Sequence, residues 1–241
     1  MSLEWIEGIF PANVAACFSN REQGVSQGSF AGFNLGRHVG DVPSRVDYNR
    51  RVLQHRCGLP AEPAWLDQVH GTEVLYRPAR PGLSADGCWT DRVGEAMTVM
   101  TADCLPVLLA SENGQKVAAV HAGWRGLAAG ILPRAIARMG VSPGELIAWV
   151  GPAIGPSAFE VGSEVREAFL AAMAGADECF QPRQERFLCD LPGLAQRQMH
   201  ELGVARIHLS GLCTYSQPQR FYSHRRQAPT GRMASLIWRK A

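Results

Sequence analysis

Two apolar runs in the middle of the chain give the clearest pattern of hydrophobic positions. The runs Leu105–Ala110 and Val117–Val120 are separated by a polar stretch containing Asn113-Gly114, a dipeptide typical of tight hairpin turns. The pattern predicts two buried strands that pair as a hairpin. Cys104 precedes the first strand and His121 follows the second, so the hairpin brings a thiol and an imidazole to one edge of a sheet.

Shorter apolar runs predict the other strands, and runs with helical spacing predict four helices. An edge strand or two, interrupted at Pro11, are expected before residue 19. Further strands are expected at residues 65–70, 86–90, 94–99, 147–155, 187–190, 206–210 and 233–238. Helices are expected at residues 41–59, 127–139, 163–174 and 191–202. Ser44 is the expected N-cap of the first helix, and Pro133 lies in the first turn of the second or kinks it. Strands outnumber helices and the two periodicities interleave, which indicates the α+β class.

Two long polar segments separate these elements. Residues 19–40 are rich in glycine, but Phe33 and Leu35 give this segment side chains to bury, which favours an ordered loop over a linker. Within it, the amide of Asn34 is suited either to the polar edge of a ligand or simply to a turn. Residues 214–231 are also irregular and contain several polar and basic residues.

Composition and charge exclude several classes of protein. A net charge of +2 is too small to indicate a nucleic-acid partner. Among 24 basic residues only Lys116 and Lys240 are lysine, and arginine suits phosphate or carboxylate binding, although biased codon usage explains the same excess. No apolar run reaches the roughly 18–20 residues that span a bilayer. Seven cysteines without a CxxC pair, together with an acidic start unlike a signal peptide, favour a reduced, cytoplasmic protein.

Three residues form a candidate metal site, since His70, Cys104 and His121 each stand at the end of an apolar run. Two imidazoles and one thiolate are a known ligand set for zinc with an open fourth position. The three are too far apart in sequence to make a local motif, and each residue alone is also compatible with a structural role. Asp86 either forms a turn or orients one of the histidines, and the sequence leaves both open.

Basic residues near this site are candidates for binding an anion. Arg125 lies between Gly123 and Gly126 just before a predicted helix, where close backbone approach and the helix N-terminus favour an anion. Arg50 lies either on a solvated helix face or turned inward toward an anion, and Arg225 belongs to the irregular segment before the last strand.

With these residues identified, the chain resembles the laccase-domain family, also called multicopper polyphenol oxidases. Its members are described as purine nucleoside phosphorylases or peptidoglycan editing factors. The resemblance covers nearly the whole chain through the stretches FNLGRHVGD, DQVHGTEV, TADCLPVLL, AAVHAGWRGLAAGIL, VGPAIGP, CTYS, SHRR and TGR.

The resemblance implies a single domain over residues 1–241 with a four-layer α/β/β/α sandwich of mixed sheets. It also implies a zinc site at His70, Cys104 and His121. The implied activity is phosphorolysis of adenosine, inosine and S-methyl-5′-thioadenosine, with adenosine deamination as a further activity. Purine nucleosides and phosphate are then the expected partners of a protein that we expect to be a monomer.

The chain departs from the family pattern in two places. Many members read Ser-Tyr-Arg-Arg where this chain has Ser223-His224-Arg225-Arg226, which puts the contact of this loop with a ligand in doubt. Pro156-Ser157-Ala158-Phe159 also differs, in a way that we expect to affect packing only.

The older oxidase name conflicts with the histidine content. Multicopper oxidation needs about ten imidazoles, usually in His-x-His pairs. This chain has seven histidines and no two are separated by one residue. Weak oxidation would therefore have to come from copper that replaces zinc.

These observations lead to one hypothesis for the site and two alternatives. In the hypothesis, Arg125, Arg225 and Arg50 hold phosphate, while Asn34 and Gln68 contact the ribose or the base. Asp103 orients a ligand or carries a proton beside Cys104 and His121. In the first alternative, Cys104 and His121 are a nucleophile and its base in an amide hydrolase that edits peptidoglycan precursors. In the second, the zinc is structural and the protein is a binding module.

Overall fold

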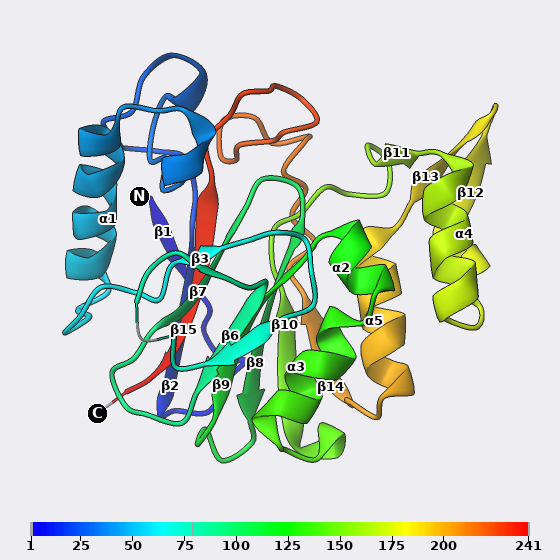
Figure 1. Cartoon of the computed structure of the whole chain (residues 1–241), viewed down its shortest axis with the longest axis horizontal. Helices are drawn as coiled ribbons and strands as arrows, with labels where there is room; N and C mark the ends of the chain where they lie inside the picture. The colour runs from blue at the N-terminus through cyan, green and yellow to red at the C-terminus, as the bar shows by residue number, and fades with distance from the viewer. Residues whose placement is uncertain (1, 79, 241) are drawn as a thin grey trace.

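The protein is built from two β-sheets packed face to face, with helices on both outer faces (Figure 1). We describe it from a computed structural model, in which residues 2–78 and 80–240 are described. No helix within these residues is long and apolar enough to cross a membrane.

The first sheet joins the beginning and the end of the chain. Its order is β1-β2-β15-β7, and all its pairs are antiparallel. Its strands are β1 (Leu3–Trp5), β2 (Val14–Ser19), β15 (Met233–Arg239) and β7 (Met97–Thr101). Alternate residues of β2 face opposite cores, with Phe18 toward the second sheet and Cys17 toward α1 (Pro43–Arg56). Both faces are buried because helix covers one and sheet the other.

The second sheet has the order β14-β10-β8-β9-β6-β4 and contains the predicted hairpin. Its strands are β14 (Arg206–Leu209), β10 (Leu146–Val150), β8 (Leu105–Ser111), β9 (Val117–Ala122), β6 (Gly87–Thr90) and β4 (Val74–Tyr76). β8 and β9 pair antiparallel from Leu105 opposite Ala122 onward, which confirms the hairpin. β10 with β14 and β4 with β6 are parallel pairs, so the sheet is mixed.

Three hydrophobic cores separate four layers, which confirms the α/β/β/α sandwich. One core lies between the sheets, and a second lies between the first sheet and α1. The third fills the space between the second sheet and the helices α2 (Trp124–Ala128), α3 (Ile131–Met139) and α5 (Leu191–Glu201).

Smaller elements complete the fold. A three-stranded sheet of β11 (Glu160–Val161), β13 (Arg186–Cys189) and β12 (Phe180–Arg183) lies beside α4 (Ser163–Ala172), at the far right of Figure 1. β3 (Leu66–Asp67) pairs with β5 (Leu83–Ser84). Short 3-10 helices lie at Gly28–Phe30, Arg37–Val39, Pro143–Glu145 and Ala176–Cys179.

Several local predictions need correction. Val42 precedes α1 as its N-cap without a side-chain bond, and Ser44 lies inside the helix, because Pro43 occupies the first turn. The helix predicted at 127–139 is broken at Gly130, whose φ of 89° is left-handed. The strand predicted at 65–70 is only two residues long. β4, β5 and β12 were not predicted, because such short segments carry too little periodicity.

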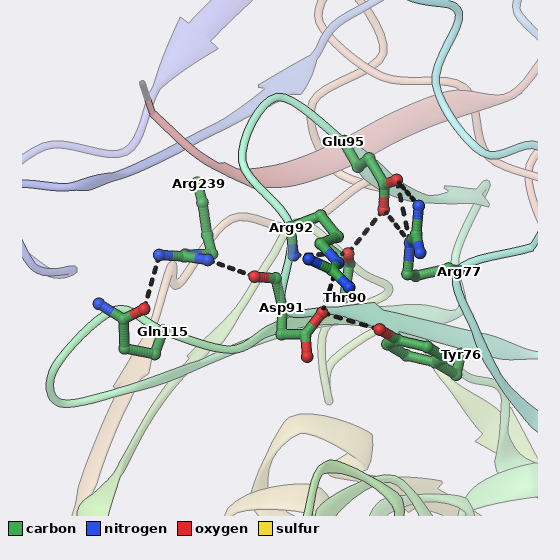
Figure 2. A network of polar contacts seen from close by, with 8 residues as sticks. All are labelled: Tyr76, Arg77, Thr90, Asp91, Arg92, Glu95, Gln115 and Arg239. Carbon is green, nitrogen blue, oxygen red and sulfur yellow. Dashed lines mark hydrogen bonds and ion pairs between the residues drawn. The ribbon is translucent and has the colours of Figure 1, made fainter.

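A polar network joins the two sheets where β15 ends (Figure 2). Arg239 donates to the carbonyl oxygens of Gly114 and Asp91 and to the side chain of Gln115. In the same network Arg77 makes a bidentate ion pair with Glu95, at N–O distances of 2.6–3.0 Å. The hairpin turn of the second sheet is thereby fastened to the last strand of the first.

Candidate functional site

His70, Cys104 and His121 meet at the opposite end of the sandwich. Their possible ligand atoms all lie within 4.8 Å of one another. His121 is in β9, Cys104 comes directly before β8, and His70 follows β3 in a left-handed conformation with a φ of 59°. The two imidazole rings have centroids 4.8 Å apart at 76°. His121 is buried, Cys104 is partly buried and His70 is exposed, so the group faces outward on one side.

Asp86 organises this group from beneath, which decides between the two roles left open by the sequence. Its fully buried carboxylate accepts hydrogen bonds from the backbone amides of Val69, His70 and Gly71 at 3.3, 2.9 and 2.7 Å. It also lies 2.7 Å from Nδ1 of His121. Asp86 therefore fixes both the main chain at His70 and the ring of His121.

The charged groups around His121 raise its pKa by more than its burial lowers it. Burial alone would lower the pKa of His121, but the charge of Cys104 and the bond to Asp86 raise this pKa to about 9. Burial would likewise raise the pKa of Asp86, yet the hydrogen bonds from His121 and from the amides of Gly71 and His70 lower it. The carboxylate is held in its charged form.

Gly123 and Gly126 lie where the site leaves no room for a side chain. A Cβ at Gly123 would lie 2.7 Å from Nδ1 of His70 and 3.2 Å from Sγ of Cys104. A Cβ at Gly126 would lie 2.8 Å from the carbonyl oxygen of Gly71. α2 has only five residues, and an anion at its N-terminus stays a prediction.

The three side chains fit a metal ion by their chemistry and their support. Zinc takes imidazole nitrogen at about 2.0–2.1 Å and thiolate sulfur at about 2.3 Å, so ligand atoms this close can share one ion. A ligand histidine usually bonds a carboxylate through its other nitrogen, as His121 does with Asp86. Among the described residues this is the one group of three or more such side chains, whereas a multicopper centre needs several.

A cavity of about 390 Å³ opens directly above the candidate ligands. Apolar side chains of Trp124, Ile154 and Phe159 form one part of its lining. Four basic side chains form another part, namely His38, His224, Arg225 and Arg232. The cavity thus offers both an apolar surface for a ring and cationic groups for an anion.

Asp103, one of the predicted catalytic residues, ties the C-terminal loop to the site. Its carboxylate accepts from Oγ1 of Thr214 at 2.6 Å, Oγ of Ser223 at 3.0 Å and the amide of Arg225 at 2.7 Å. Its φ of 93° places this non-glycine residue in the left-handed region directly before Cys104. These contacts support a positioning role for Asp103.

The amides predicted to contact a nucleoside are already bonded within the protein. Asn34 is fully buried, donates to Asp41 at 2.9 Å and accepts from the amides of Gly36 and Arg232. Gln68 lines the cavity, but its amide bonds both the N–H and the C=O of Met100, at 2.7 and 2.8 Å.

The three arginines predicted to hold phosphate occupy different places. Arg50 is buried with its guanidinium 3.9 Å above the Trp65 ring, and burial, followed by the charge of Arg37, lowers its pKa to about 10. Arg125 is exposed beside Trp124 and is not among the residues that line the cavity. Arg225 does line it and donates to the carbonyl oxygen of Glu160 at 2.7 Å.

Sequence reasoning missed Arg232 and His38, which both face the cavity. Burial lowers the pKa of each, and the charge of Arg232 lowers that of His38 further, so the two basic groups lie near one another. The stretches FNLGRHVGD and TGR contain both residues and were the available signals.

The chain is similar over most of its length to known proteins. A sequence model described as "Multi-copper polyphenol oxidoreductase laccase" matches residues 15–240. A Pseudomonas aeruginosa protein named purine nucleoside phosphorylase is 50% identical over 230 residues, covering 95% of this chain and 94% of the relative. The Escherichia coli purine nucleoside phosphorylase YfiH is 46% identical, covering 95% of each chain. A crystal structure from Neisseria meningitidis superposes with a TM-score of 0.96 at 43% identity over 100% of both chains.

Proposed function

The chain belongs to the multi-copper polyphenol oxidoreductase laccase family, and on that premise we propose that it is a zinc-dependent purine nucleoside phosphorylase. The proposed substrates are adenosine, inosine and S-methyl-5′-thioadenosine, with adenosine deamination as a second activity. Relatives named purine nucleoside phosphorylase, at 43–50% identity, support this class of enzyme.

One observation carries the proposal: the group of His70, Cys104 and His121 opens into a cavity that has both apolar and basic walls. A purine nucleoside needs an apolar surface for its base, and phosphate needs cations. The cavity has both beside the candidate metal ligands, so it could hold the base and the phosphate close together, as phosphorolysis requires.

We assign zinc to His70, Cys104 and His121, with copper as an adventitious substitute. Zinc held by three protein ligands supplies a Lewis acid with an open coordination position. Asp86 holds His121 and the backbone of His70 in place for this role.

The remaining residues have proposed roles that follow from their contacts. Trp124 and Phe159 offer faces on which a purine base can stack. Arg225 remains a candidate for phosphate because its side chain lines the cavity. Asp103 holds the main chain of Arg225, and Asn34 holds the main chain of Arg232, so both act by positioning.

The decisive experiment measures free base released from adenosine and inosine, with and without phosphate. Wild-type protein is compared with Cys104→Ala and with Cys179→Ala, which changes a partly buried cysteine outside the cavity lining. We expect release that requires both phosphate and Cys104 and that Cys179→Ala retains.

Other outcomes overturn the proposal in distinct ways. Release without phosphate would identify a nucleoside hydrolase. No release from protein that contains zinc would favour the amide hydrolase that edits peptidoglycan precursors. If Cys104 is instead a free nucleophile and the zinc is held elsewhere, Cys104 should react with alkylating agents without prior chelation, whereas a zinc-bound thiolate would be protected.

A further inference from the structure

Arg232 is a partly buried cation whose charge has no ion-pair partner among the described residues. Its side chain lines the cavity, near enough to Cys104 and Asp103 for both charges to raise its pKa against the effect of burial. Yet no carboxylate within the described part of the chain lies within 4 Å of its guanidinium. Removing a charge from water without a partner is costly, so such groups usually mark a binding site.

The protein fixes the position of Arg232 from two sides. Its amide donates to Oδ1 of Asn34 at 2.9 Å, and its Nη1 donates to the carbonyl oxygens of Thr230 and Gly231 at 3.0 and 3.1 Å. Gly36 leaves room for its stem, because a Cβ there would lie 2.8 Å from Cγ of Arg232. Within the described residues, Nε and Nη2 of Arg232 make no hydrogen bond.

Two other arginines, one buried and one partly buried, are satisfied by the protein itself. Arg226 directs its guanidinium to the carbonyl oxygens of Thr214, Tyr215 and Phe221, at 2.6–2.8 Å. Arg50 bonds the carbonyl oxygen of Leu35 and stacks on Trp65. Arg232 is therefore unlike these residues, since two of its nitrogens are left for a ligand.

The groups around Arg232 leave it free to bind an anion. The carboxylate of Asp103 is engaged by Thr214, Ser223 and the amide of Arg225. The charge of Cys104 is offset when the candidate ligands hold a metal cation. His38, in the 3-10 helix Arg37–Val39, also lines the cavity and is near enough to Arg232 to feel its charge, so it adds a second donor there.

We propose that Arg232, assisted by His38, forms the inorganic phosphate subsite of this cavity. The proposal rests on the proposed phosphorolysis and assigns the phosphate to a residue other than Arg50 and Arg125. Nε and Nη2 of a guanidinium present two parallel N–H groups that match two oxygens of a phosphate. His38 donates to a third oxygen.

Phosphate kinetics and phosphate binding test this assignment together. Arg232→Gln removes the fork, Arg232→Lys keeps only the charge, and Arg51→Gln removes an exposed cation of α1 as a matched control. We expect Arg232→Gln to raise the KM for phosphate by about 10- to 100-fold, the loss expected for a charge-assisted pair of hydrogen bonds. Arg232→Lys should give a smaller increase. The KM for inosine and the zinc content should change less than about twofold in both variants.

A binding measurement without nucleoside separates this inference from the proposed function. We expect inorganic phosphate to stabilise the wild-type protein and Arg51→Gln against heat, but not Arg232→Gln, because a ligand stabilises only the fold that binds it. This pattern in a protein that releases no base would sustain the anion site and overturn the phosphorylase. Phosphorolysis with an unchanged phosphate KM in Arg232→Gln would overturn the subsite alone. Neither phosphorolysis nor stabilisation by phosphate in the wild type would overturn both.

Discussion

The strand β15 connects two ends of the molecule whose arginine side chains differ in their bonding partners. At its end, Arg239 donates to a carbonyl oxygen and to Gln115, and the nearby Arg77 pairs with Glu95 (Figure 2). Just before its start, Arg232 has no carboxylate partner within the described residues, while the nearby Asp103 is engaged by hydroxyl and amide groups. Both ends are rich in arginine, but of Arg77, Arg239 and Arg232 it is Arg232 whose Nε and Nη2 have no acceptor within the described residues.

The difference teaches how to separate structural from functional charge. A network that satisfies its own charges at the surface fastens strands and adds little stability per pair. A partly buried cation is costly to maintain when the nearby carboxylate is bonded to other groups, and a bound anion would offset that cost. The partners of a charge are therefore more informative than the number of charges.

The largest effect should follow from a change beside the candidate metal ligands, in Asp86→Asn. The asparagine amide cannot accept every hydrogen bond that the carboxylate accepts from three backbone amides and His121. We expect zinc affinity to fall about 10- to 100-fold, as is usual when the group that orients a ligand is lost. Competition with a chelator measures this affinity.

The matched control for this prediction lies in the surface network. Asp91 also accepts a side-chain hydrogen bond, from Tyr76 at 2.8 Å, but is exposed. Asp91→Asn should leave zinc affinity unchanged. If Asp86→Asn retained zinc as tightly as Asp91→Asn does, the role given to Asp86 would be wrong.

A second change tests whether the site needs empty space. In Gly123→Ala the new methyl group would lie 2.7 Å from Nδ1 of His70 and 3.2 Å from Sγ of Cys104, so the two candidate ligands must shift. We expect weaker zinc binding than in the wild type, by at least about tenfold, since a tetrahedral site loses one of three ligands. Metal content after gel filtration measures the loss.

Gly144→Ala is the control for the methyl group itself, because nothing lies within 4 Å of a Cβ there. It should bind zinc normally. Equal zinc content in the two alanine variants would show that His70 is free to shift without leaving the metal, contrary to the crowding argument.

Local patterns in the sequence explain which parts of the site could be predicted. The hairpin of β8 and β9 follows from two apolar runs and an Asn-Gly turn, so the meeting of Cys104 with His121 was predictable. The end of an apolar run made His70 the third candidate ligand, and the family resemblance, confirmed by the match over residues 15–240, supplied the four layers.

Contacts between distant segments explain what was missed. Asn34 holds the amide of Arg232 across 198 residues, and Asp86 reaches His121 across 35. Periodicity and turn chemistry describe neighbours in sequence, so they do not reveal such pairs. For the same reason the sequence directed attention to Arg50 and Arg125, whose side chains are not part of the cavity lining.

The smallest effect is expected at the other end of β15, where Glu95→Gln weakens the bidentate pair with Arg77 and the bond from Thr90. Because the side chains of Arg77 and Glu95 are 40% and 33% exposed, water replaces the lost ion-pair partner, and the melting temperature should fall by no more than about 2 °C. Zinc affinity and the KM for phosphate should equal those of the wild type, since the network lies at the far end of the sandwich from the cavity. Calorimetry together with the same zinc and phosphate assays measures all three quantities. A change in either binding constant would mean that the two ends are coupled through β15, and the distinction between structural and functional arginines would then fail.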